Sequence, residues 1–433
     1  MKIKALAFVL MAVLLLCGCG QKSETAAATP AQAVTASAAQ SSTVRPVSTG
    51  VTPEQFGAKG DGIADDLQAL QAAMQQASAS GRPLELTAGA VYRFSSCLGL
   101  PSGLTIQGNG AVLLSDIQYP DLKEDRVAVE LMKDSDDDHV HDVRLENVTF
   151  RAAHSCQANY MLRVMLARNV EFVGCTFDCE PNEWGRCAAD LYGGNENIRF
   201  EGCVFRQMTS GASGGIWVRN WTDRVESRNI RFQNCEFYKS GADELLAVWG
   251  WGGAVRDVVL SGCSFYETQE GLDADHRPVW FITLGQSGTT DVRMEDCTVR
   301  AEYCETIFRM VGDKTRAVVD NCDITMRQPD SMAKHDMKKG ANPMLARGND
   351  RADGSTVIQN SRITLSGDNG RRICYQLSAL KGNTLDVSLG YGITSTKEVS
   401  GNTIRGRIRH KVFQDCSGVE NNNVEVRRFS ILG

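Results

Sequence analysis

Two adjacent carboxylic acids in the middle of the chain, Asp243 and Glu244, have the residue types that cleavage of a glycosidic bond requires. Glycosidases use two carboxyl groups, one held protonated as the acid and the other ionised as the base or nucleophile. Neighbouring like charges help to separate the two roles, because each disfavours ionisation of the other. The pair is therefore the first candidate for a catalytic centre.

A second polar cluster follows in the segment 271–277. His276 or Arg277 could remove a proton beside a uronate carboxyl group, while Asp273 and Asp275 hold Ca²⁺ or the substrate carboxylate. That would be lyase or epimerase chemistry. A glycosidase of this kind is expected to need no cofactor, so Ca²⁺ is expected only if the protein is a lyase.

All six tryptophans lie in the same central third of the chain as these acids. Indole rings offer broad apolar faces that suit the C–H faces of sugars, so their position favours a saccharide groove. The residues expected to bind the substrate are Trp217, Arg219, Trp249, Trp251, Asp273, Asp275, Trp280, Glu305 and Arg309, with Asp190 one or two coils upstream. The alternative is that some tryptophans fill the interior and the charges solvate one face, because alternate strand residues point inward.

The strands that carry these residues each precede a copy of a nine-residue repeat. Segments 169–177, 197–205 and 229–237 begin with Asn, have apolar residues at positions two, four and nine, and have Cys at position seven. Segments beginning at Asp257, Asp291 and Arg316 continue the pattern. Strand-type alternation that recurs about every 20 to 40 residues is typical of a β-solenoid. Stacking of the copies should place the candidate site residues side by side.

The cysteine at position seven should lie at one corner of each coil. Parallel coils stack about 4.8 Å apart, which exceeds the Cβ separation of a typical disulfide, so we expect a column of buried thiols. The column comprises Cys175, Cys203, Cys235, Cys263, Cys297 and Cys322, and later copies have Ser361, Asn383, Asn402 and Asn422 instead. Cysteines outside it include Cys156, Cys179, Cys187, Cys304, Cys374 and Cys416. Their pairing is open, with Cys179 and Cys187 in one insertion.

The segment 51–77 contains F-G-A-K-G-D-G-I-A-D-D-L-Q-A-L-Q-A-A. This sequence resembles the opening of the pectate-lyase-like superfamily, which includes polygalacturonases, rhamnogalacturonan-degrading enzymes and phage tailspikes. The resemblance implies an all-β fold, a right-handed single-stranded parallel β-helix. A short N-terminal helix within residues 51–80 would cap its open end.

Within this opening segment, Phe56 is expected to begin a short strand. Leu67, Leu70, Met74 and Ala77 lie on one face of the following helix, which would cover the core. The acids Asp61, Asp65 and Asp66 are expected to be structural, with Asp65 or Asp66 capping the helix.

The resemblance defines the fold more narrowly than the reaction, since the superfamily includes hydrolases, lyases, epimerases and non-catalytic binders. Asp243 and Glu244 resemble the paired acids of polygalacturonases, but that family's Asn-Thr-Asp, Gly-His-Gly and Arg-Ile-Lys motifs do not occur here. We expect a polysaccharide-cleaving glycosidase. The alternatives are a lyase or epimerase acting on uronate polymers, and a non-catalytic surface β-helix that binds polysaccharide.

The N-terminus indicates export and lipidation. A positive start and an apolar stretch precede Leu16-Cys17-Gly18-Cys19, which resembles the lipobox of bacterial lipoproteins. Residues 1–19 would then be the signal peptide with its lipobox, and Cys19 would be the lipidated residue. Residues 20–50 are rich in Ala, Ser, Thr and Gln and are expected to form a disordered tether to the folded domain at 51–433. The protein should be lipid-anchored in the cell envelope, at the outer membrane, because Gly20 and not Asp follows the cysteine.

The net charge of −6 is spread along the chain without a basic patch. Nucleic acid is therefore not expected as a partner, whereas a polysaccharide and, through Cys19, a membrane are expected. The repeats continue to the C-terminus, so no trimerisation domain is expected and the protein should be a monomer.

The lipobox hypothesis makes a direct prediction. Substitution Cys19→Ala should abolish lipid labelling and leave unprocessed precursor, because the acceptor thiol is gone. Metabolic labelling with a fatty-acid analogue measures this. Continued labelling of the variant would contradict the assignment of Cys19.

Overall fold

The computed structural model describes residues 50–119, 126–131, 139–179, 187–208, 215–220, 225–239, 244–267, 280–328, 343–349, 353–367 and 370–428. The chain divides into two units, Met1–Val47 and Ser48–Gly433, and only the second contains described residues. The predicted signal peptide, Cys19 and nearly all of the tether thus lie outside the described residues. In the described ranges, no helix is both long and apolar enough to cross a membrane.

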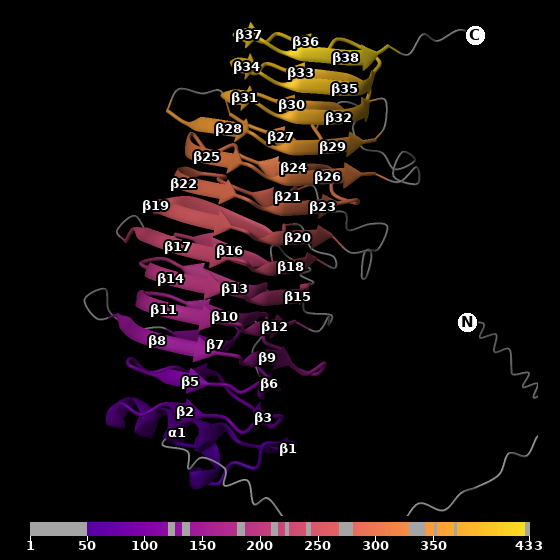
Figure 1. The fold of residues 1–433 in the computed structure, drawn as a ribbon. Helices are drawn as coiled ribbons and strands as arrows, with labels where there is room; N and C mark the ends of the chain where they lie inside the picture. The colour runs from indigo at the N-terminus through magenta and orange to yellow at the C-terminus, as the bar shows by residue number, and fades with distance from the viewer. Residues whose placement is uncertain are drawn as a thin grey trace, which may run out of the picture. The chain divides into compact units, whose positions relative to one another are not determined.

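The second unit is a right-handed parallel β-helix, as predicted (Figure 1). Each full coil has three strands, which contribute in turn to sheets that we call C, A and B. Every strand pairs in parallel with its counterparts in neighbouring coils, for example β10 (Tyr160–Val164) with β13 (Cys187–Tyr192). The register shifts in three pairs, β1 with β3, β15 with β18 and β19 with β22, and is one-to-one in the others, so equivalent sequence positions form columns along the axis.

The strand bounds follow this three-sheet order. Sheet C contains β4 (Leu98–Gly99), β7 (Val127–Leu131), β10, β13, β16 (Ile216–Arg219), the first part of β19 (Leu246–Ser261), β21 (Trp280–Thr283), β24 (Thr306–Arg309), β27 (Ala346–Arg347), β30 (Arg372–Tyr375), β33 (Tyr391–Thr394) and β36 (Phe413–Gln414). Sheet A contains β2 (Leu84–Glu85), β5 (Thr105–Gln107), β8 (Val140–Glu146), β11 (Ala167–Val173), β14 (Glu196–Glu201), β17 (Ser227–Gln233), the second part of β19, β22 (Gly288–Glu295), β25 (Lys314–Asp320), β28 (Ser355–Gln359), β31 (Ala379–Lys381), β34 (Glu398–Ser400) and β37 (Val419–Glu420). Sheet B contains β1 (Asp61–Asp65), β3 (Val91–Phe94), β6 (Val112–Ser115), β9 (Thr149–Ala152), β12 (Thr176–Asp178), β15 (Val204–Met208), β18 (Glu236–Lys239), β20 (Ser264–Glu267), β23 (Thr298–Ala301), β26 (Asp323–Arg327), β29 (Arg362–Ser366), β32 (Thr384–Leu389), β35 (Thr403–Ile408) and β38 (Asn423–Arg427).

The nine-residue repeat spans the corner between sheets A and B. Its apolar positions point inward, and Val170, Phe172, Cys175 and Phe177 are fully buried in the first clear copy. Phenylalanines at position four stack along the axis, with ring centroids 4.7 Å apart between Phe172 and Phe200. The predicted inward pattern is confirmed, and the stacked rings add aromatic contacts to the burial of apolar surface.

The corner itself contains the predicted column of thiols. The six position-seven cysteines are buried and free, and each Sγ contacts a backbone carbonyl of the preceding coil, for example Cys203 with Phe172 O at 3.3 Å. Toward the C-terminus, asparagine side chains occupy the same corner position in place of the cysteines. Asn383 Nδ2 donates to Asn402 Oδ1 at 3.0 Å, and Asn402 Nδ2 donates to Asn422 Oδ1 at 2.9 Å.

No disulfide forms among the remaining cysteines that the structure describes. Cys179 and Cys187 are both buried, and the pairing that the sequence left open between them does not occur. Cys156, Cys304 and Cys374 are also buried, and Cys416 is half-buried. The core therefore uses thiols as small apolar side chains.

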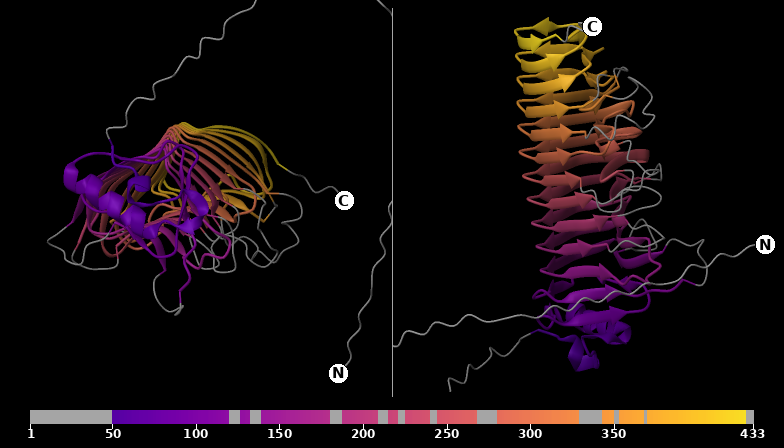
Figure 2. Two further views of the ribbon diagram at one scale, coloured as in Figure 1. Left: turned by 90° about the horizontal axis from the view of Figure 1, so that it is seen from below. Right: turned by 90° about the vertical axis from the view of Figure 1, so that its right-hand side faces the viewer.

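Helix α1 (Leu67–Ser80) lies across the N-terminal end of the solenoid, as Figure 2 shows along the axis. Its buried face holds Leu70, Ala73, Met74 and Ala77, which confirms the predicted cap. Asp66 is structural, because its carboxylate accepts hydrogen bonds from the backbone N–H groups of Lys59 at 2.7 Å and Gly60 at 3.1 Å.

The prediction that Phe56 begins a strand is wrong. Phe56 ends the 3₁₀ helix η1 (Pro53–Phe56), and the first strand begins only at Asp61. A proline at the first helical position favours this turn, and Gly57 ends it in the left-handed region with φ of 97°.

The two longest intervals between consecutive strands separate a sheet B strand from the next sheet C strand. The connection between β20, which ends at Glu267, and β21, which begins at Trp280, runs from sheet B to sheet C. The connections between β12 and β13 and between β26 and β27 join the same two sheets. We refer to this corner as the loop corner, and the N-terminal ends of the sheet C strands adjoin it.

The thiol column predicts a specific reactivity. Cys203, Cys235 and Cys263 should resist alkylation in the native protein and react after denaturation without reductant, as mass spectrometry of tryptic peptides can measure. Cys235→Ser should lower the free energy of unfolding by about 1 kcal/mol, because a more strongly hydrated hydroxyl would replace a buried thiol. A disulfide mapped between any two of these residues would refute the unpaired column.

Candidate functional site

The outer face of sheet C is where several of the predicted site residues meet. On β16, Ile216 and Val218 point into the main core, so Trp217 and Arg219 point outward. Trp217 belongs to a separate apolar cluster with Cys187 and Ala247, and Trp249 packs against it. These two tryptophans therefore do not fill the solenoid interior, in contrast to the alternative that the sequence left open.

Trp217 and Trp249 form a stacked pair, with ring centroids 5.6 Å apart and an interplanar angle of 26°. Their indole N–H groups are buried and have no hydrogen-bond partner within the described ranges. Buried polar groups usually have a hydrogen-bond partner in the protein, a water molecule or a ligand. Two neighbouring indole N–H groups without such a partner therefore favour a ligand-binding function. Trp251, near the middle of β19, is 60% exposed.

Arg219 is held in a buried charge network that joins three successive coils. The carboxylate of Asp190, on β13, accepts hydrogen bonds from Arg219 Nε at 2.7 Å and from Arg163 Nη2, on β10, at 3.1 Å. The Arg219 guanidinium also lies 4.1 Å from the Trp217 ring centroid and 5.0 Å from that of Tyr192. Asp190 thus fixes the side chain of Arg219 against the indole platform, and burial makes these charge-assisted bonds strong.

A second group lies on the following coils and includes Glu244, Trp280 and Arg309. Glu244 directly precedes β19. Its Oε1 accepts a hydrogen bond from Thr283 Oγ1 at 2.7 Å and forms an ion pair with Arg309 Nη1 at 3.4 Å. Arg309 also donates to Gln286 Oε1 at 3.0 Å, and its guanidinium lies 5.1 Å from the Trp280 ring centroid. The register brings these residues together although 65 positions separate Glu244 from Arg309.

The environment of Glu244 favours its protonated form. Glu244 is only 4% exposed, and this burial raises the pKa of its carboxyl group. The contacts with Thr283 and Arg309 lower the pKa, but the effect of burial is larger. Its second oxygen, Oε2, has no hydrogen-bond partner among the residues that the structure describes. A carboxyl group of this kind can hold a proton and donate it, which is the role of a general acid.

Several predicted site residues lie outside the described residues, namely Asp243, Asp273, Asp275, His276 and Arg277. Their catalytic and binding roles remain predictions. Glu305, which precedes β24, is half-buried. Within the described ranges, no group of three His, Cys, Asp or Glu side chains could hold a metal ion.

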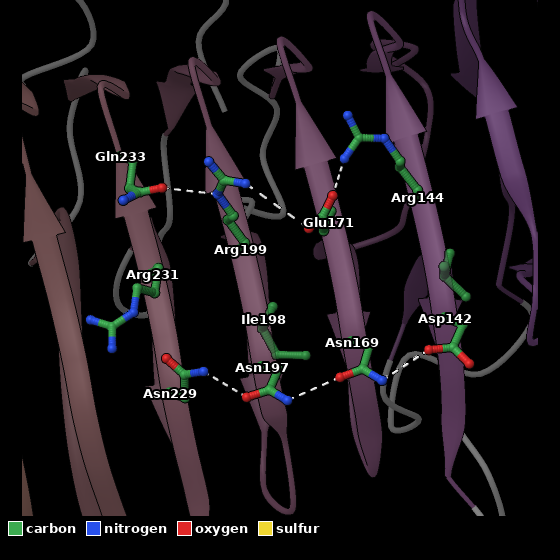
Figure 3. A pocket seen from close by; sticks show the side chains of 11 residues that line it. Asp142, Arg144, Asn169, Glu171, Asn197, Ile198, Arg199, Asn229, Arg231 and Gln233 are labelled. Atoms are coloured by element: carbon green, nitrogen blue, oxygen red, sulfur yellow. Dashed lines mark hydrogen bonds and ion pairs between the residues drawn. The ribbon is translucent and has the colours of Figure 1, made fainter.

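A groove of about 500 Å³ lies elsewhere, on the outer face of sheet A, and the sequence-based search missed it (Figure 3). Its lining comprises Asp142, Val143, Arg144, Asn169, Glu171, Asn197, Ile198, Arg199, Asn229, Arg231 and Gln233. Amide side chains cross its floor in a ladder, with Asn229 Nδ2 donating to Asn197 Oδ1 at 2.6 Å and Asn197 Nδ2 to Asn169 Oδ1 at 2.9 Å. The available signal was the asparagine at position one of three successive repeat copies.

Comparison with known families agrees with this architecture. Residues 51–273, just over half of the chain, match the family described as Rhamnogalacturonase A/epimerase, pectate lyase-like. The chain belongs to this family. A search of curated proteins finds no match.

Solved structures that resemble this chain have low sequence identity to it. PfbA, a surface adhesin of Streptococcus pneumoniae, is 15% identical with a TM-score of 0.55, and the alignment covers 88% of this chain and 91% of that one. The tailspike protein of Acinetobacter phage vB_ApiP_P1 is 12% identical with a TM-score of 0.48, over 89% and 64% of the two chains. The A-module of the mannuronan C-5 epimerase AlgE4 of Azotobacter vinelandii is 16% identical with a TM-score of 0.38, over 88% and 100%. At these identities, the adhesin establishes the shared fold and leaves the activity open.

The buried network around Asp190 makes a prediction for stability. Asp190→Ala should lower the free energy of unfolding by about 3 kcal/mol or more, because two buried guanidinium groups would lose their shared carboxylate. The matched control is Glu226→Ala, which removes the exposed partner of Arg256 at 3.0 Å and should cost less than about 1 kcal/mol. Denaturant unfolding compares the two, and equal losses would contradict the structural role of Asp190.

Proposed function

We propose that this protein cleaves a polysaccharide by hydrolysis on the outer face of sheet C, with Glu244 as the proton donor. The observation that supports this most is the buried Glu244 carboxyl group, which has a raised pKa and lies beside Arg309 and Trp280. Membership in a family described as rhamnogalacturonase and epimerase supports a carbohydrate substrate.

In this mechanism, protonated Glu244 transfers its proton to the oxygen of the glycosidic bond as the C–O bond breaks. The leaving sugar departs as an alcohol, and the remaining sugar carries positive charge until water adds and releases a proton. Asp243, the neighbour of Glu244 in sequence, is proposed as the carboxylate that activates the water or attacks directly. Arg309 then stabilises the Glu244 carboxylate that the transfer leaves behind.

The aromatic side chains are proposed to bind the substrate at two places. Trp280 and Arg309 lie on the coils after the proton donor, whereas Trp217, on the preceding coil, and Trp249, on the coil of Glu244 itself, form a platform. The unsatisfied indole N–H groups of that platform would donate to sugar hydroxyl groups. Arg219, Trp251 and Glu305, together with Asp273, Asp275, His276 and Arg277, are proposed to complete substrate binding.

We also propose that the protein acts at the cell surface, anchored to the outer membrane through lipidated Cys19 and present as a monomer. The lipobox-like sequence and the tether-like segment that follows it support this location. The similarity in fold to a protein described as a surface adhesin is consistent with it. A Ca²⁺ requirement is proposed only for lyase activity.

The proposed proton donor is tested by Glu244→Gln, which retains size and removes the acid. Turnover should fall about 10²-fold or more, as for the loss of a general acid. The measurement is a reducing-end assay over a polysaccharide panel, with parallel absorbance of unsaturated uronates. Product formed without unsaturated uronates indicates hydrolysis, whereas their appearance would identify a lyase and contradict the proposal.

A matched control is Glu236→Gln, which makes the same chemical change on the exposed face of sheet B and should retain wild-type turnover. Activity of the wild-type protein should also decline as the pH rises through the raised pKa of Glu244, because the proton donor is then lost. Wild-type turnover in Glu244→Gln would refute its role.

A further inference from the structure

We propose that the groove on sheet A is a second, non-catalytic binding site for a neutral polysaccharide, occupied by a chain that runs along the solenoid axis. The inference rests on the proposed function for the class of ligand, but it concerns a different sheet and different residues. The groove is lined by residues of β8, β11, β14 and β17 (Figure 3). Glu244 and Arg309 instead belong to the sheet C side of the coil.

The amide ladder leaves hydrogen-bonding groups available in the groove. It runs from Asn229 through Asn197 and Asn169 to Asp142, and each asparagine donates to the residue on the preceding coil, so that Asp142 only accepts. Every amide nitrogen carries two N–H groups and every amide oxygen has two lone pairs, so the ladder uses only half of this capacity. The last member, Asn229, has an Oδ1 with no hydrogen-bond partner among the described residues.

The charged residues of the groove are paired and argue against an anionic ligand. Arg144 pairs with Glu146 at 2.6 Å and also with Glu171. Arg199 pairs with Glu201 at 2.7 Å and donates from Nε to Gln233 Oε1 at 2.9 Å.

Arg231 completes the set by pairing with Asp257 at 3.0 Å. Each guanidinium that lines the groove is therefore neutralised by a carboxylate. The surface presents fixed donors and acceptors and no net positive charge, which suits sugar hydroxyl groups better than carboxylate or sulfate groups.

The spacing of these groups indicates an extended ligand. Equivalent side chains recur once per coil, at about 4.8 Å along the axis. A polymer whose units repeat at a similar distance can meet the same donor and acceptor set on each coil. The four coils of the ladder thus fit a segment of roughly four sugar units.

The site can be tested by affinity gel electrophoresis against soluble neutral polymers (dextran, mannan, galactan and arabinan) and acidic ones (polygalacturonate and alginate). At least one neutral polymer should retard the native protein. The double variant Asn197→Gly and Asn229→Gly should bind that polymer about fivefold or more weakly, because it loses several hydrogen bonds. Glycine accommodates the native backbone, since φ is 58° at Asn197 and 53° at Asn229.

A matched control is Asn321→Gly, at φ of 50°, whose side chain donates to Asp296 outside the groove at 2.6 Å. Its affinity should equal that of the native protein. The single variant Asn229→Gly, at the end of the ladder, should weaken binding about twofold to threefold and removes only one ladder bond. If the double variant does not fold, the affinity of the single variant Asn229→Gly is compared with that of the native protein instead.

The binding and cleavage proposals can fail separately. Glu244→Gln should bind the neutral polymer as tightly as the native protein even where it has lost turnover. Retardation by acidic polymers alone, or by none, would overturn the groove proposal. Equal affinity of the native protein and folded Asn197 and Asn229 variants, or an equal loss in the Asn321→Gly control, would also overturn it.

Discussion

The in-register stacking of parallel coils is the constraint on which the other features of this protein depend. It is set at the corner between sheets A and B, where a residue in the left-handed region, such as Gly174 with φ of 61°, precedes a small buried side chain. The small side chain lets successive corners approach to the strand spacing, and a thiol or an amide can contact the preceding coil from there. Any residue that shifted this corner would displace both flanking strands.

On the outer surface, the same register converts distant positions into neighbours. Arg163, Asp190 and Arg219 come from three successive coils and form one buried charge network. Glu244 and Arg309 meet in the same way although 65 positions separate them in the sequence. Each outer face therefore presents similar side chains in columns along the axis. Sheet C presents aromatic and acidic groups, and sheet A presents amides and paired charges. A polymer that follows the axis could use either column.

The fold was predictable because inward positions repeat, and repetition is visible without knowing the register. Val170, Phe172, Cys175 and Phe177 follow the pattern that the next five copies share. Phe56 was misassigned because a local proline turn and Gly57 outweighed the strand pattern of the family motif. The sequence could predict that polar residues of neighbouring coils lie side by side. It could not predict that Glu244 contacts Thr283 and Arg309, because such partners depend on the direction of each side chain. The amide ladder was not anticipated, because an asparagine at a turn looks the same in sequence whether or not it bonds to the next coil.

The central claim is that the register places Glu244 in a buried position where it retains a proton. The most direct measurement is infrared difference spectroscopy of the carboxyl C=O stretch during a pH titration, comparing the native protein with Glu244→Gln. The account predicts a protonated carboxyl signal that persists above the ordinary glutamate range in the native protein and is absent from the variant, because burial raises this pKa. Identical titrations of the two proteins would contradict it.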